Sequence, residues 1–138
     1  MKTLPRIENS EDSLVLRTDF SDETAWKSIC EAIRQPVGDF RAHVALVSDA
    51  EYDRATPEQL ISLIPKGWDQ TFMFVVDRTA ISHPERPILV LDLYAEPGRT
   101  FRVIPSQLWG VQNNLSIANM DFGEFADAAG EDGIFRGF

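Results

Sequence analysis

Three aspartates follow three apolar segments of the chain, and together they have the chemistry of a metal site. Asp19 follows a β-type run, and Asp49 and Asp77 follow two continuous apolar runs. Ligands of open α/β sheets bind outside the carboxyl ends of the strands. If these ends lie side by side, the carboxylates could hold Mg²⁺ and activate a phosphoryl or acyl group. The alternative is local, because an aspartate after a strand often accepts hydrogen bonds from the next backbone N–H groups.

Other catalytic patterns are weak in this sequence. His83 lies in a proline-bracketed loop beside Ser82 and Glu85, but sequence neighbours rarely form a working triad. Cys30 falls in the apolar stripe of an expected helix, where a buried thiol is inert. Glycine-rich phosphate loops and zinc-binding motifs are absent. We therefore assign no catalytic residue and no cofactor.

The segment from Trp109 to Asn119 combines carboxamides with apolar side chains. Amides both donate and accept hydrogen bonds, so Asn113, Asn114 and Asn119, with Trp109 as an anchor, are candidates for binding a peptide backbone or a polar ligand. The alternative is a long connection in which the same amides satisfy the backbone.

The last quarter of the chain is acidic, since no Lys or Arg lies between Arg102 and Arg136. An acidic face can bind a basic protein, because complementary charge raises the association rate and the specificity. We take Glu124 and Asp127 as binding residues of this face. Its carboxylates are Asp121, Glu124, Asp127, Glu131 and Asp132.

Composition narrows the class of partner. The 138 residues include 13 Lys and Arg against 22 Asp and Glu, a formal net charge of −9. Such a chain has no general attraction for nucleic acid or anionic lipid, so neither is an expected partner. A lone cysteine excludes an internal disulfide and fits a reducing cytoplasm, and no apolar run is long enough to span a membrane. The composition is also compatible with a homo-oligomer.

Residues 1–12 are polar and aperiodic and are expected to be a flexible leader, followed by a single α/β domain at 13–138. The pattern predicts β-α-β-α-β, then an antiparallel meander and a short C-terminal helix, in a mixed sheet of about five strands. Segment 105–120 is expected to be irregular or a short helix, and 133–138 a last short strand. The five main strands are expected at 13–18, 44–47, 72–76, 88–91 and 100–104.

Helix signals are local and clear. Ser21 is expected to cap a first helix, whose apolar stripe includes Trp26. Thr56 opens a second helix with a capping box, and Asp121 opens the C-terminal helix in the same way. The Pro97-Gly98 pair indicates a type II turn between the last two strands of the meander.

Four stretches resemble an uncharacterised family of small bacterial domains of unknown function. The resemblance spans nearly the whole chain and implies no activity, cofactor or catalytic residue. The four stretches are LVLRTDFSD at 14–22, RTFRVIPS at 99–106, W-x-x-x-NNLSIANMDF at 109–122 and FRGF at 135–138.

The sequence favours a non-catalytic protein-interaction module, which includes an immunity-type protein, that binds a basic partner. The alternative is a Mg²⁺-dependent hydrolase or phosphoryl-transfer enzyme built on Asp19, Asp49 and Asp77. A third class is a small-ligand sensor in which Arg17 or Arg102 clamps an anion.

Overall fold

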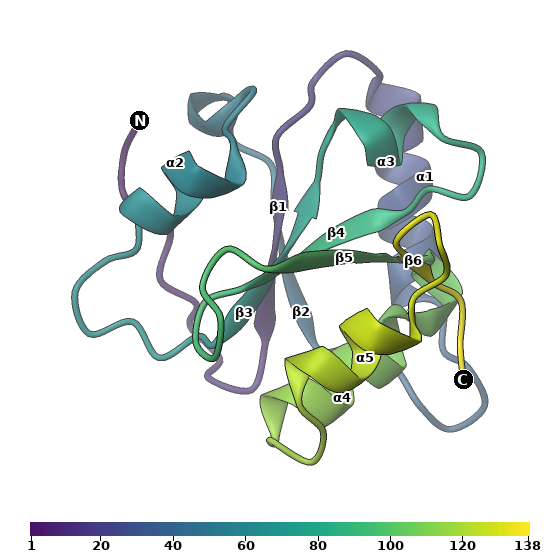
Figure 1. Cartoon of the computed structure of the whole chain (residues 1–138). Coiled ribbons are helices and arrows are strands. Elements are labelled where there is room, and N and C mark those ends of the chain that lie inside the picture. Colours follow the sequence, from purple (N-terminus) through teal and green to yellow (C-terminus); the bar gives the residue numbers. More distant parts are fainter.

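Six strands form one mixed sheet in the order β2-β1-β3-β4-β5-β6 (Figure 1). The computed structural model describes residues 1–138. The strands are β1 (Ser13–Arg17), β2 (Val44–Val47), β3 (Phe72–Val76), β4 (Ile88–Asp92), β5 (Thr100–Val103) and β6 (Ile134–Phe135).

The strand directions confirm the predicted α/β class. β1 pairs in parallel with both β2 and β3, while β3, β4 and β5 form the antiparallel stretch. The sheet has one strand more than the five of the predicted core, because the short β6 adds in parallel beside β5. The turn between β4 and β5 has the predicted form, with Gly98 at a φ of 98° and the N–H of Arg99 donating to the carbonyl of Glu96.

Five α-helices and two short 3₁₀ helices connect the strands. The α-helices are α1 (Glu23–Arg34), α2 (Pro57–Ser62), α3 (Arg78–Ser82), α4 (Leu108–Ser116) and α5 (Phe122–Ala128). The 3₁₀ helices are η1 (Ala50–Tyr52) and η2 (Pro105–Gln107).

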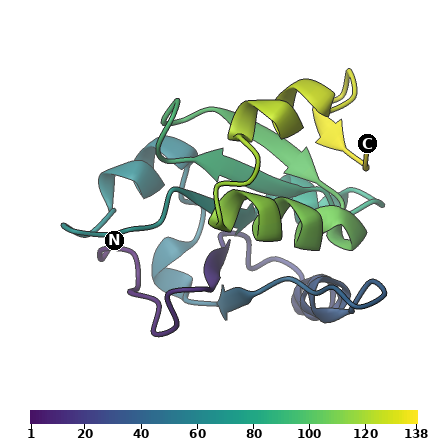
Figure 2. The ribbon, with the colours of Figure 1, turned by 90° about the horizontal axis from the view of Figure 1, so that it is seen from below.

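Successive side chains of each strand point to opposite faces of the sheet, so apolar strand residues form a core on each face. The larger core, of 20 buried residues, includes Val15 and Phe74 and is closed by α1, α4 and α5. The smaller core, of 10 buried residues, includes Leu14 and Met73 and is closed by α2 and the N-terminal segment. Figure 2 shows α2 and the N-terminus away from α4, α5 and the C-terminus.

Local capping follows the sequence signals with one shift. The Thr56 and Asp121 capping boxes are both formed. The first helix is capped by Asp22 and not by Ser21, because the Ser21 hydroxyl instead donates to the Asp19 carboxylate while Asp22 accepts from the N–H of Ala25.

Two stretches are more regular than their composition suggests. Segment 105–120 contains η2 and the nine-residue helix α4, whose buried side chains include Leu108 and Val111. Burial of this apolar stripe in the larger core stabilises the helix despite its asparagines. α3, which the sequence patterns do not indicate, is a single short helix capped by Asp77.

The N-terminal segment, expected to be a loose leader, has no helix or strand but is attached to the domain. Leu4 is buried in the smaller core, and its N–H donates to the carbonyl of Leu63. The Tyr52 hydroxyl donates to the carbonyl of Thr3 at 2.6 Å.

None of the helices has the length and apolar character needed to cross a membrane.

Candidate functional site

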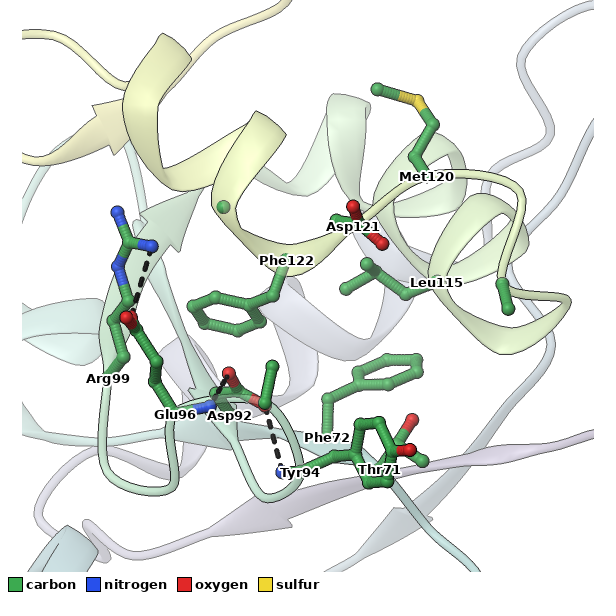
Figure 3. Close-up of a pocket in the computed structure, with 13 residues that line it drawn as sticks. Thr71, Phe72, Asp92, Tyr94, Glu96, Arg99, Leu115, Met120, Asp121 and Phe122 are labelled. Atoms are coloured by element: carbon green, nitrogen blue, oxygen red, sulfur yellow. Dashed lines mark hydrogen bonds and ion pairs between the residues drawn. The ribbon is translucent and has the colours of Figure 1, made fainter.

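A pocket lies where the β4–β5 turn faces the connection between α4 and α5 (Figure 3). Its volume is about 830 Å³, within the range of ~300–1,000 Å³ typical of ligand sites. The thirteen lining residues are Thr71, Phe72, Asp92, Tyr94, Ala95, Glu96, Arg99, Leu115, Ala118, Met120, Asp121, Phe122 and Gly123.

The interior of the pocket is apolar. Phe72, Leu115 and Phe122 come from β3, α4 and α5, and Figure 3 shows their side chains converging. Each is buried by the larger core, and the ring of Phe122 packs edge-on against that of Phe101 at 5.0 Å between centroids. The core therefore fixes these walls, so the apolar surface exists before any ligand arrives.

The β4–β5 turn is organised by the buried carboxylate of Asp92. One oxygen accepts the N–H of Tyr94 and the other accepts the N–H of Glu96, each at 2.9 Å (Figure 3). The N–H of Gly98 donates to the Asp92 carbonyl. These bonds satisfy a carboxylate that would otherwise be costly to bury, and they fix the backbone from which Tyr94, 77% exposed, lines the pocket.

Arg99 closes one side of the pocket. Its guanidinium pairs with Glu96 at 3.2 Å and with Asp127 of α5 at 2.8 Å. A Cβ at position 123 would lie 3.2 Å from Nη1 of Arg99, so Gly123 leaves room for the guanidinium against α5. The ion pair between Arg99 and Asp127 therefore links the β4–β5 turn to α5, the two walls of the pocket.

Three carboxylates and one guanidinium line the pocket. Because Glu96 and Asp127 neutralise the guanidinium of Arg99, the remaining charge at the rim is negative. The exposed carboxylate of Asp121 stands at the start of α5. The site combines an apolar interior with an acidic rim.

The amides singled out in the sequence are hydrogen-bonded within the molecule. Asn113 donates to the carbonyl of Arg41, and Asn114 donates to the carbonyl of Gly110. Asn119 donates to the side-chain oxygen of Asn114 and closes the end of α4. These bonds match the alternative in which the amides satisfy a connection, and none of the three asparagines lines the pocket.

Trp109 lies away from the pocket, on the first turn of α4. Its indole stacks on the exposed ring of Phe40, with centroids 4.9 Å apart. Its Nε1 is buried and has no hydrogen-bond partner.

The acidic helix face is partly neutralised. Glu124 accepts the N–H of Asp121 in the capping box, and Asp127 pairs with Arg99. Asp132 pairs with Arg136, which also pairs with Glu85 of the α3–β4 loop. Of the predicted acidic face, Asp121 lines the pocket, and Glu124 and Asp127 are linked to it through Asp121 and Arg99.

The three strand-end aspartates lie at one edge of the sheet, as the parallel strands dictate, but they do not gather. β2 and β3 flank β1 on opposite sides, so their ends are two strand spacings, about 10 Å, apart. No group of three or more His, Cys, Asp or Glu side chains is placed to hold a metal ion.

Each of these aspartates is used locally. Asp19 accepts the N–H and hydroxyl of Ser21, and Asp49 accepts the N–H of Glu51. Asp77 accepts the N–H of Ala80 at the start of α3. This is the capping role that the sequence left open beside the metal.

Two of the carboxyl groups have lowered pKa values. Burial alone would raise the pKa of Asp19, but the hydrogen bonds from Ser21 and the charges of Arg78 and Arg17 together lower it. The ion pair with Lys2 lowers the pKa of Asp49. Both groups are therefore ionised at neutral pH.

The sequence reasoning missed Phe72, Tyr94, Glu96, Arg99 and Phe122 as site residues. They come from three separated segments, and only the fold brings them together. The turn signal at Pro97-Gly98 and the long asparagine-rich motif were the available pointers, because both segments flank the pocket.

Fold and pocket define an α/β domain with an acidic-rimmed apolar pocket. The family model described as Domain of unknown function (DUF6924) matches residues 12–138. The chain therefore belongs to this family, which confirms the resemblance seen in the four sequence stretches. A search of the curated proteins finds no match.

Proposed function

We propose that this protein is a non-catalytic interaction module whose pocket receives an apolar side chain of a partner protein, flanked there by basic residues. The observation that carries the proposal is the pairing of a preformed apolar interior with an acidic rim. An immunity-type protein, which acts by binding a basic partner, is one form of such a module.

The size and shape of the pocket support a side-chain guest. Phe72, Leu115 and Phe122 give the pocket an aromatic and aliphatic lining, which matches the chemistry of a Phe or Leu side chain. Apolar anchors that fill preformed pockets carry most of the binding energy in protein interfaces. Tyr94 at the mouth adds a rigid ring that can cover the guest.

The charges support a basic partner. Glu96 and Asp121 stand at the rim, and the one cation, Arg99, is already paired. An anionic ligand would meet this negative field, whereas Lys or Arg beside the guest would pair with the rim. The net charge of −9 adds long-range attraction for the same class of partner.

The predicted acidic face continues this rim along α5. Glu124 and Asp127 are exposed and lie one and two turns beyond Asp121. A partner seated in the pocket would therefore meet further carboxylates on the same helix, as the sequence-based proposal of an acidic binding face requires.

Peptide binding tests the proposal. Capped peptides with a central Phe, Leu or Ala, each flanked by Lys, Gln or Glu, are titrated into the protein by fluorescence anisotropy. The proposal expects binding to be strongest for Phe or Leu between lysines and to be lost with a central Ala or with Glu flanks. Equal binding of all lysine peptides, central Ala included, would contradict it, because charge alone would then explain the binding.

Surface variants locate the binding. Tyr94→Ala and Glu96→Gln, both at exposed side chains, are expected to weaken binding of the Phe peptide between lysines. Phe40→Ala and Glu58→Gln remove an exposed aromatic and an exposed carboxylate elsewhere and are expected to leave it unchanged. If the Phe40 and Glu58 variants weakened peptide binding as much as the Tyr94 and Glu96 variants, the assignment of binding to this pocket would be contradicted.

A further inference from the structure

Arg17 is a buried cation at the carboxyl end of β1. Its side chain is 3% exposed. β1 lies between β2 and β3, and the chain crosses from β1 to β2 on one side and then to β3 on the other. This is the switch point at which open α/β sheets bind ligands, outside the carboxyl ends of the strands.

The donors of Arg17 are incompletely used. Nε donates to the carbonyl of Asp19, and Nη1 donates to Glu23 at 2.8 Å and to the hydroxyl of Ser48 at 3.2 Å. Nη2 is buried and donates to nothing. The guanidinium also lies over the ring of Phe20, at 4.3 Å from its centroid. A buried N–H of a charged group without an acceptor is costly, so an acceptor at this position would be favourable.

Arg102, the second arginine considered as an anion clamp, is different. Its Nη1 and Nη2 donate to the two oxygens of Asp77 at 2.9 and 2.7 Å, and Nη1 also reaches the carbonyl of Pro87. Both terminal nitrogens of Arg102 are therefore already paired with a carboxylate, whereas Nη2 of Arg17 has no acceptor. The comparison singles out Arg17.

Glu23 is the carboxylate that now pairs with Arg17, and it uses only one of the two terminal nitrogens. It binds Arg17 through a single oxygen, and its side chain is 61% exposed, so it can swing into solvent. An oxyanion that replaces this carboxylate could accept from Nη1 and Nη2 together, which is the favoured geometry of a guanidinium.

The first turn of α1 adds donors to the same place. The N–H groups of Glu23 and Thr24 have no acceptor in the protein, since Asp22 caps the N–H of Ala25. The positive end of a twelve-residue helix favours an anion beside these groups. The hydroxyl of Ser48, which is exposed, stands on the β2 side of the guanidinium.

We propose that Arg17, Ser48 and the first turn of α1 bind a phosphate group, which displaces the carboxylate of Glu23. A phosphate has oxygens in more than one plane and so can accept from the guanidinium, the hydroxyl and the helix N–H groups together, which a planar carboxylate cannot. The site lies at the opposite end of the strands from the acidic-rimmed pocket and is independent of its function.

Thermal shift and calorimetry with sodium phosphate test the proposal, with sodium chloride at matched ionic strength as the reference. Glu23→Gln removes the internal competitor and is expected to bind phosphate about tenfold more tightly than the unchanged protein. Ser48→Ala is expected to weaken binding. Glu31→Gln removes an exposed carboxylate from the same helix and is expected to bind as the unchanged protein does.

Two results would overturn the proposal. In one, phosphate stabilises Glu23→Gln no more than chloride does. In the other, Glu23→Gln and Glu31→Gln gain affinity equally, which would mean a general effect of charge. O-phosphoserine and adenosine monophosphate, titrated beside phosphate, distinguish a phosphorylated side chain from a nucleotide as the source of the group.

Discussion

The side-chain oxygen of Gln112 accepts the backbone N–H of His43 at 2.9 Å, across 69 residues of sequence. Gln112 is completely buried, and its amide nitrogen donates to the hydroxyl of Ser13 at 3.2 Å. One side chain of α4 therefore ties together the starts of β1 and β2. The asparagine-rich segment, which the sequence presents as a binding surface, here holds the sheet to the helix layer.

Replacing Gln112 tests this connection. Gln112→Leu places an apolar side chain of similar size at this position and removes the acceptor of the His43 N–H, which costs about 1 kcal/mol or more. Urea unfolding should show a lower midpoint at an unchanged slope. Asn113→Ala, at the neighbouring and less buried position, should cost less. Equal midpoints for Gln112→Leu and the unchanged protein would contradict the structural role.

Ala118 sits in the left-handed backbone region, at a φ of 54°, just after the end of α4. Glycine adopts this conformation without the Cβ clash, so Ala118→Gly should raise the free energy of unfolding by about 0.5–1 kcal/mol. Ala128→Gly, at the exposed last residue of α5, should instead lower it, because glycine is a poorer helix former than alanine. Calorimetric melting of both variants checks the pair, and a lower Tm for Ala118→Gly would contradict the backbone assignment.

Acid should weaken the attachment of the C-terminal segment. Hydrogen bonds from Arg136 lower the pKa of Glu85 and of Asp132. A lowered folded-state pKa stabilises the protein above the unfolded-state pKa, near ~4, and this stability is lost as pH falls through the folded-state value. Melting between pH 6 and pH 3 should therefore show a falling Tm that is shallower in Arg136→Gln. An identical pH dependence in the two proteins would show that these pairs contribute nothing.

Salt should weaken partner binding. Glu96 and Asp121 are exposed at the rim, where the screening length is about 8 Å at physiological ionic strength. Raising the salt concentration should lower the affinity for a peptide with Phe between lysines mainly by slowing association, while the dissociation rate changes little. Stopped-flow anisotropy at several salt concentrations separates the two rates. A salt-independent association rate would exclude an acidic rim as the steering element.

The sequence predicts those features of the fold that depend on neighbouring residues. The capping boxes at Thr56 and Asp121 form because the residues that make them lie three apart in the chain. Continuous apolar runs predict strands β2 and β3 and hence a parallel start to the sheet, although only β3 is buried, because β2 is the half-buried edge strand. The one misplaced cap, at Ser21, follows from a hydrogen bond to Asp19 that competes with capping.

The site depends on packing and could not be predicted in the same way. Phe72, Asp92 and Phe122 meet only because β3, β4 and α5 are placed together by the core. At the strand ends, topology does place Asp19, Asp49 and Asp77 at one edge. The strand order, which the residue pattern does not show, places the ends of β2 and β3 on opposite sides of β1. The local hydrogen bonds of these aspartates match the alternative that the residue pattern did indicate.

The most direct test of the proposed function is a two-dimensional ¹⁵N–¹H NMR titration of the protein with a capped peptide that carries Phe between lysines. The account predicts that the largest amide shifts fall in the β4–β5 turn, from Tyr94 to Arg99, and in the α4–α5 connection, from Ala118 to Gly123. The same titration with Ala in place of Phe should leave these amides nearly unmoved. Shifts centred on Trp109 and Phe40, or no shifts with saturating Phe peptide, would contradict the assignment of this pocket as the binding site.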